Sequence, residues 1–93
     1  MHWSWNSGKA KSNLKKHGVS FDEAETVLRN AGTLVFYDGE NSSTNEDRFR
    51  SIGMSIKLNV LVVVHCERAG NENRIISARR ANKSEVKRWQ ERS

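Results

Sequence analysis

Residues 60–81 constrain the fold of this chain more than any other stretch. Residues 60–64 are four valines and a leucine, a polar cluster around Gly70 and Asn71 follows, and Ile75 and Ile76 start a second apolar run. Two segments of high strand propensity on either side of Gly and Asn predict a β-hairpin. An apolar run without alternation is typical of a strand covered on both faces, so the first of these strands should lie in the middle of a sheet.

The register of this hairpin decides which side chains share a face of the sheet. A turn centred on residues 71–72 predicts three cross-strand pairs: Cys66 with Ser77, His65 with Ala78, and Val64 with Arg79. His65 and Glu67 then share one face with Arg80, because side chains alternate along a strand. Arg68 and Arg79 lie on the other face. A slip of one residue would reverse the second strand.

The other segments predict three helices and two more strands. The predicted helices cover residues 8–16, 21–31 and 83–91, and the predicted strands cover residues 33–37 and 48–56. Ser7, Ser20 and Asn82 are suitable N-caps for these helices, and Gly18 should end the first one, which we expect to dock through Ala10, Leu14 and neighbouring side-chain stems. The polar residues 40–46 predict a mobile loop.

These elements predict one α+β domain that spans residues 1–93. Its order is two N-terminal helices, an antiparallel sheet of four strands, and a C-terminal helix, with the helices on one face and a polar face left open. Trp3 and Trp5 are two residues apart, so they point to one side and should attach the N-terminus to the core. The acidic side chains of the second helix should be solvated: Asp22, Glu23 and Glu25.

The charge pattern indicates a polyanionic partner. The net charge is +5, with basic residues concentrated before residue 20 and after residue 47 and acidic residues between them. Such basic surfaces attract nucleic acid. No apolar segment approaches a membrane span or a signal region, and the single Cys66 cannot form an internal disulfide. We therefore expect a cytoplasmic protein without a membrane partner.

The candidate chemistry needs neither a metal ion nor a cofactor. Cys66 and His65 are adjacent on a strand, where side chains diverge, and no glycine-rich phosphate loop is present. RNA cleavage without a metal requires a base, an acid and cations that stabilise the extra negative charge of the transition state. His65 could carry the proton, because its reference pKa is about 6.5, and Glu67 is a second candidate.

Planar guanidinium groups are suitable ligands for the RNA phosphate. The arginines available near the strand ends are Arg48, Arg50, Arg68, Arg79 and Arg80. Lys9 and Lys16 could bind flanking phosphates. Each residue also has a structural interpretation, since arginines at strand ends form salt bridges and a strand histidine is often only hydrogen-bonded. We expect the arginines and His65 to gather at one rim of the sheet.

Several motifs together resemble the BrnT family of toxins. They are Trp5-x3-Lys9-x3-Asn13-x2-Lys16-His17-Gly18-Val19-Ser20-Phe21-x-Glu23-Ala24, Glu46-x-Arg48-x3-Ile52-Gly53, Leu61-Val62-Val63-Val64-His65 and Arg74-Ile75-Ile76-Ser77-Ala78-Arg79-Arg80-Ala81. The resemblance covers nearly the whole chain. It implies site residues at the matching positions, which are Lys9, Arg48, His65, Arg79 and Arg80. One departure is Asn6, where the family usually has Asp.

The resemblance also implies a function and a partner. It implies a compact ribonuclease of the RelE type that stops translation by cutting RNA. It further implies a BrnA antitoxin with a DNA-binding part, and a complex of two toxins with two antitoxins that represses its own operon. The alternative is a non-catalytic nucleic-acid-binding subunit that acts on operator DNA with its partner. A third interpretation is a structural domain whose basic face pairs with an acidic protein.

Overall fold

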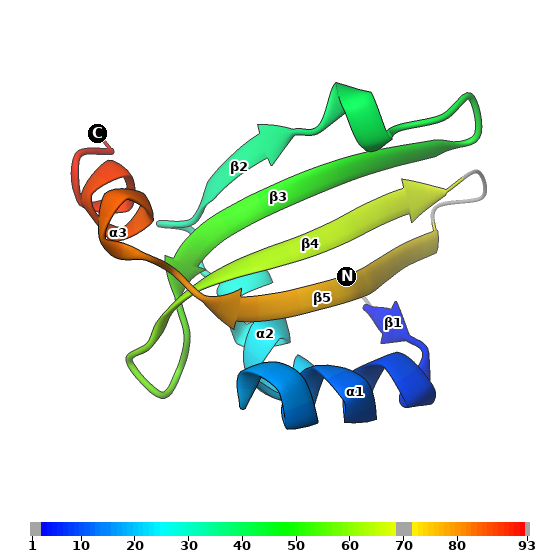
Figure 1. Ribbon diagram of the computed structural model, residues 1–93. Helices are drawn as coiled ribbons and strands as arrows, with labels where there is room; N and C mark the ends of the chain where they lie inside the picture. Colours follow the sequence, from blue (N-terminus) through cyan, green and yellow to red (C-terminus); the bar gives the residue numbers. More distant parts are fainter. Residues whose placement is uncertain (1–2, 69–71, 93) are drawn as a thin grey trace.

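The computed structural model describes residues 3–68 and 72–92, which form three helices and a five-stranded sheet (Figure 1). The elements are β1 (Ser4–Trp5), α1 (Ser7–His17), α2 (Phe21–Leu28), β2 (Leu34–Tyr37), the 3-10 turn η1 (Gly39–Asn41), β3 (Glu46–Met54), β4 (Val60–Arg68), β5 (Glu72–Arg80) and α3 (Lys83–Gln90). The predicted α+β class and the three helices are confirmed. Of the predicted loop 40–46, residues 40–41 lie in η1 and Glu46 starts β3. No helix within the described residues has the length and apolar character needed to cross a membrane.

The sheet has one more strand than the sequence predicts, and it is mixed rather than antiparallel. Its strand order is β1-β5-β4-β3-β2, and β1 runs parallel to β5 while the other neighbours are antiparallel. The prediction of four antiparallel strands is therefore wrong. A strand of two residues has no periodicity of its own, so only its pairing with Arg74 and Ile75 identifies it. Trp3 is buried beside it, as expected.

The central hairpin forms, but its predicted register is wrong by two residues away from the turn and by three residues next to it. Ala78 pairs with Val63 rather than with His65, and a β-bulge follows between Val64 and His65, so that His65 pairs with Ile75. The shift of two residues leaves Ala78, Arg79 and Arg80 on their predicted faces, whereas the shift of three residues beyond the bulge puts Arg74 and Ile75 on the faces opposite to those that alternation predicts. The His65 side chain therefore still points to the opposite face of the sheet from Arg68 and Arg79. The predicted turn centre lies partly outside the described residues.

The first helix begins and docks differently from the prediction. Its N-cap is Asn6, not Ser7, and the Asn6 side chain accepts a hydrogen bond from the Lys9 backbone N–H at 3.0 Å. An asparagine caps a helix as well as an aspartate does, so Asn6 retains this role. Gly18 ends the helix with φ 69°, as predicted. Ala10 packs against the core, as predicted, but Leu14 is 53% exposed and the buried residue of α1 is Asn13.

The second helix carries a buried carboxylate that the sequence predicts to be solvated. Ser20 caps α2 by accepting a hydrogen bond from the Glu23 N–H at 3.0 Å. The Glu23 side chain is buried and accepts hydrogen bonds from Ser55 Oγ at 2.6 Å and Asn59 Nδ2 at 2.9 Å. Burial raises the pKa of Glu23, but these hydrogen bonds outweigh it and leave the pKa below its ordinary value. The carboxylate thus attaches α2 to the β3–β4 turn.

The helices cover different faces of the sheet. The main core lies between the sheet and α1 and α2, and it consists of Trp3, Val19, Phe21, Ala24, Val27, Leu61, Val63, Ile75 and Ala78. In Figure 1, α3 lies apart from α1 and α2, beyond the end of β5. It contacts the other face, where the Arg88 guanidinium lies 4.7 Å from the centre of the Phe36 ring. The prediction that all helices lie on one face is therefore wrong.

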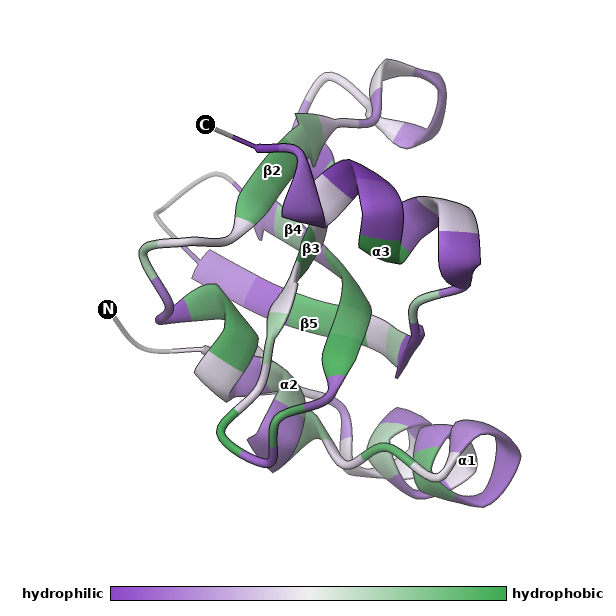
Figure 2. Cartoon of the chain, turned by 90° about the vertical axis from the view of Figure 1, so that its left-hand side faces the viewer, coloured by the Kyte–Doolittle hydropathy of each residue, from purple (hydrophilic) through white to green (hydrophobic). Residues whose placement is uncertain are grey.

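The hydropathy of α3 differs from that of the sheet and of α2. Figure 2 shows hydrophobic colour along much of the sheet, β2 included, and on part of α2, whereas α3 is mostly hydrophilic. The helix α3 begins with the predicted capping box of Asn82 and Glu85. A short polar helix can cover only one end of the sheet, so the rest of the face opposite α1 and α2 stays open.

Candidate functional site

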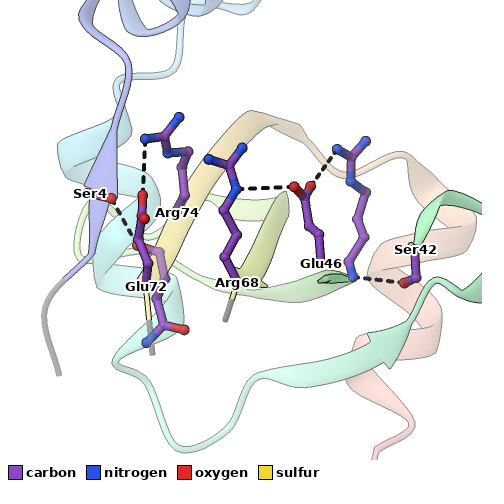
Figure 3. Close-up of polar contacts among 8 residues, drawn as sticks. Ser4, Ser42, Glu46, Arg68, Glu72 and Arg74 are labelled. Carbon is purple, nitrogen blue, oxygen red and sulfur yellow. Dashed lines mark hydrogen bonds and ion pairs between the residues drawn. The ribbon is translucent and has the colours of Figure 1, made fainter. Parts of the chain in front are cut away.

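The open face of the sheet carries a group of arginines on three adjacent strands. The cross-strand pairs put these side chains on the same face, and they are Arg48, Arg50, Arg68, Arg74 and Arg79. Figure 3 shows Arg68 and Arg74 side by side, with Glu46 next to Arg68. We refer to these five arginines and the surface between them as the arginine face. The same strands place only Glu46 and Glu72 as acids on it, so its net charge is positive.

Glu46 lies between two of the arginines. Its Oε1 accepts a hydrogen bond from Arg48 Nη2 and its Oε2 accepts one from Arg68 Nε, each at 3.1 Å. The hydrogen bond from Arg48 is the main cause that lowers the pKa of Glu46 below its ordinary value. Glu46 is therefore an ionised carboxylate at neutral pH. The motif Glu46-x-Arg48 was the signal for this residue, because period-two spacing puts both side chains on one face.

Arg79 is held by a carboxylate of the C-terminal helix. Its Nη1 and Nη2 donate to the two oxygens of Glu85 at 2.8 and 2.9 Å. This bidentate pair fixes the guanidinium plane and joins β5 to α3. The hydrogen bond from Arg79 is the largest cause that lowers the pKa of Glu85. The predicted site contains Arg79, but it does not include Glu85.

The remaining arginines differ in their partners. Arg74 forms an ion pair with Glu72 at 3.1 Å. Arg50 is exposed, and within residues 3–68 and 72–92 it forms no ion pair. Between these arginines the floor of the face includes Cys66, which is fully buried. Burial raises the pKa of the Cys66 thiol, which makes it a poor nucleophile.

His65 is not part of the arginine face. Cross-strand pairing with Phe49 and Ile75 places it on the side of the sheet that α1 and α2 cover. It is 6% exposed, its Nε2 lies 2.7 Å from Ser51 Oγ, and its ring stacks on Phe49 with centroids 5.5 Å apart. Burial lowers its pKa to about 4, so the ring is neutral at pH 7. The expectation that His65 and the arginines gather at one rim is wrong.

The other predicted site residues also lie away from the arginine face. Glu67 and Arg80 are exposed and point to the same side of the sheet as His65. Lys9 and Lys16 are exposed residues of α1, which packs on that side through Asn13. Side-chain alternation explains this result, because neighbouring residues such as Arg79 and Arg80 must point to opposite faces. The structure therefore brings together only Arg48, Arg50, Arg68 and Arg79 of the predicted set.

The buried state of His65 predicts how stability depends on pH. Its pKa is lowered from 6.5 to about 4 in the folded chain, so the unfolded chain binds a proton first as the pH falls. The free energy of unfolding should therefore decrease between pH 6.5 and pH 4, by about 3 kcal/mol in total. Urea unfolding at several pH values would measure this loss.

A His65→Gln variant is the matched control, because glutamine does not titrate. Its free energy of unfolding should show a flatter pH dependence over the same interval, whatever its absolute stability. Equal slopes for the two proteins would contradict the assignment of the pH dependence to His65.

Metal-binding side chains do not converge in the described part of the chain. Residues 3–68 and 72–92 contain no group of three His, Cys, Asp or Glu side chains placed to hold a metal ion. The groups that do converge are cations and carboxylates on the arginine face. This arrangement can bind and orient a phosphate through charge-assisted hydrogen bonds.

Comparison with known proteins identifies the family. The family described as "Ribonuclease toxin, BrnT, of type II toxin-antitoxin system" matches residues 5–85. The chain belongs to the BrnT family. Among curated proteins no sequence matches significantly. The fold is similar to the crystal structure of the Brucella abortus ribonuclease toxin BrnT, with a TM-score of 0.65 and 23% sequence identity over 89% of this chain and 100% of that one.

Membership of the BrnT family indicates what kind of protein carries the arginine face. The family consists of ribonuclease toxins of type II toxin-antitoxin systems, so an antitoxin partner is implied. The match begins at Trp5 of β1, includes both N-terminal helices and strands β2 to β5, and ends in the first turn of α3. The segments that carry the arginine face therefore all lie within the region that defines the family.

Proposed function

We propose that this BrnT-family chain is a metal-independent RNA endonuclease that binds its substrate on the arginine face. The observation that carries the proposal is the set of guanidinium groups from β3, β4 and β5 on one open side of the sheet. Fixed guanidinium groups can stabilise the charge that develops on the phosphate in the transition state. Rigid strands also hold such groups more accurately than loops do.

Cleavage begins with attack of the RNA 2′-hydroxyl on the neighbouring phosphorus atom. The P–O5′ bond then breaks to leave a 2′,3′-cyclic phosphate, and the leaving 5′ oxygen takes a proton from water. Arg48 and Arg68 bind the phosphate oxygens in this proposal, and Glu46 between them accepts the proton of the 2′-hydroxyl. In the free protein, the two arginines keep Glu46 ionised. When the phosphate takes over their N–H groups, the Glu46 carboxylate loses hydrogen bonds and its basicity rises. A base positioned in this way contributes about 10²- to 10⁴-fold to a rate.

The sequence-based assignment of proton transfer to His65 changes accordingly. The ring is neutral and covered by Trp3 and Phe49 on the opposite face, where it forms a hydrogen bond with Ser51. We propose that His65 stabilises the fold and that it does not touch the scissile phosphate. Arg79 has a double role, since its bond to Glu85 orients it and also holds α3 at the edge of the arginine face.

The cellular role follows from the family. We expect the enzyme to inhibit translation by cutting RNA and to be neutralised by a BrnA-type antitoxin. A complex of two toxins and two antitoxins would contact operator DNA through the antitoxin. The proposal includes a fold and a chemistry of the RelE type.

Incubation of the purified chain with RNA in EDTA tests the proposal. We expect cleavage to continue in EDTA and to stop when the antitoxin is added. An Arg48→Ala/Arg68→Ala double variant, purified in the same way, controls for contaminating ribonucleases. RNA that stays intact with the wild-type chain, under conditions where the chain binds it, would contradict the enzyme.

One observation favours the alternative of a non-catalytic nucleic-acid-binding subunit. Arg48, Arg68, Arg74 and Arg79 all form ion pairs with glutamates in the free chain, and His65, the only histidine in the strands that the structure describes, lies on the other face. Under this alternative, RNA or DNA binds in a salt-dependent way but is not cleaved. The incubation in EDTA distinguishes the two functions directly.

A further inference from the structure

Two carboxylates face each other on the side of the sheet opposite the arginine face. Asp47 of β3 and Glu67 of β4 are direct cross-strand partners, and both are exposed. Within the described residues neither forms an ion pair with a cationic side chain. Like charges in directly opposed positions destabilise a sheet. The fold of the described chain offers no compensation for this repulsion, so a cation from outside would relieve it.

An apolar pocket lies beside these carboxylates. It has a volume of about 190 Å³, and Trp3, Val35, Phe49, His65 and Glu67 are among its lining residues. Leu28 at the end of α2 also lines the pocket, but the edge strand β2 beside it stays open, since Val35 and Tyr37 are 60% and 61% exposed. The Tyr37 ring packs edge-on against Phe49, with centroids 5.7 Å apart. An apolar surface with aromatic side chains and a charged rim is typical of a protein-binding site.

His65 supplies an independent indication that this pocket is incomplete. It is 6% exposed, and its Nδ1 has no hydrogen-bond partner within the described residues. Buried polar atoms are almost always hydrogen-bonded in folded proteins. The unpaired atom belongs to a ring that lines the pocket, so a group that enters the pocket could complete its hydrogen bonding.

We propose that this pocket is a docking site for the antitoxin. A bulky apolar side chain of the antitoxin fills the pocket, and a neighbouring arginine or lysine lies between Asp47 and Glu67. Charge decides the choice of partner, because the two carboxylates attract a basic side chain and repel RNA phosphates. The inference rests on the proposed function only in that it takes the type II antitoxin as the partner.

The position of the pocket explains how a segment bound there could also inhibit the enzyme. The strand β2 is the edge of the sheet, and its residues Val35 and Tyr37 lie beside the pocket. Phe36 points to the other face of the same strand, next to Arg50. A segment anchored in the pocket can therefore continue around this edge and reach the arginine face. The docking site and the proposed RNA-binding site stay separate surfaces, which allows them to be tested separately.

Antitoxin binding to charge-reversal and truncation variants tests the inference. The antitoxin that is encoded with the toxin is titrated into the full-length wild-type chain and into Asp47→Lys and Tyr37→Ala variants. We expect the dissociation constant to rise about 10-fold or more for each variant, since Asp47 lies opposite the pocket residue Glu67 and Tyr37 packs on the pocket residue Phe49. An Asp47→Lys/Glu67→Lys variant should show a larger increase.

Matched controls separate this surface from the rest of the chain. Asp22→Lys reverses an exposed acid on α2, and Leu58→Ala removes an exposed apolar side chain from the β3–β4 turn. Both controls should bind the antitoxin as the wild-type chain does. Thermal unfolding of every variant establishes that the domain is folded before its affinity is compared.

The outcomes distinguish this inference from the proposed function. If Asp47→Lys and Tyr37→Ala bind the antitoxin with wild-type affinity, the docking site is wrong even when the chain cleaves RNA. Loss of binding only in Arg48→Ala/Arg68→Ala would place the antitoxin on the arginine face and would also overturn the inference. Weakened binding of the pocket variants supports it, whether or not the RNA incubation shows cleavage.

Discussion

An Arg68→Ala variant is expected to cleave RNA about 100-fold or more slowly than the wild-type chain, because loss of one group that stabilises transition-state charge typically costs 10²- to 10³-fold. Arg68 ends β4 on the arginine face, where its Nε donates to Glu46. Its removal takes away a phosphate ligand and also one partner that positions the proposed base. Cleavage of a labelled RNA under single-turnover conditions would measure the loss.

Two further variants make this prediction specific. Arg68→Lys keeps the charge but loses the planar fork, so it should recover only part of the rate. Arg29→Ala is the control, because Arg29 is an exposed arginine of the α2 C-terminus that pairs with Glu25. It should cleave RNA at the wild-type rate. A fully active Arg68→Ala enzyme would remove this residue from the mechanism.

Replacement of Asn13 by alanine is expected to lower the free energy of unfolding by about 3 kcal/mol, since each buried polar group left without a partner costs about 1–3 kcal/mol. Asn13 Nδ2 donates to the carbonyl oxygens of Val19 and Ala78 at 2.9 and 2.8 Å, and its Oδ1 accepts from the Ala78 N–H at 3.0 Å. The substitution would leave all three backbone groups unpaired. Urea unfolding would measure the change.

The neighbouring Ser12→Ala substitution is the control for α1. Ser12 is exposed in the same helix, and its replacement by a better helix former should change stability little. Asn13→Asp should be at least as damaging as alanine, because a carboxylate cannot donate to the two carbonyl oxygens. If Asn13→Ala unfolds at the same urea concentration as the wild-type chain, the amide does not attach α1 to β5.

The two variants separate the two faces of the sheet. Loss of Arg68 should affect RNA cleavage with little effect on stability, because the side chain lies on the open face. Loss of Asn13 should act through stability, because the side chain lies between α1 and the covered face. His65 lies on the covered face, so its loss should also act through stability, although its residue type suggested a role in cleavage.

Local signals in the sequence were sufficient to predict most of the elements. The valine-rich run predicted β4, Ser20 and Asn82 predicted the starts of α2 and α3, and Gly18 predicted the end of α1. Each of these features depends on residues close to one another in the chain. The motifs that resemble the BrnT family were also a property of the sequence, and the family match confirms them.

Interactions between residues that are far apart in the sequence could not be predicted from these local signals. The strand β1 exists only because Ser4 and Trp5 pair with residues about seventy positions away. The burial of Asn13 and Glu23 depends on the backbone of Ala78 and on Ser55, and nothing near them in the chain indicates these partners. Sequence patterns therefore predicted an exposed Glu23 and a buried Leu14, and both predictions were wrong.

The sequence by itself determined the three helices, strands β2 to β5, the family and the number of arginines, because helix caps, strand propensity and motifs are local. Only the tertiary structure decided which arginines lie on the same face of the sheet and that His65 lies on the opposite face. The physical reason is that side chains alternate along a strand, so a residue's face depends on its neighbours in the sheet and not on its chemical type. The burial that lowers the pKa of His65 likewise arises only when Trp3 and Phe49 cover it.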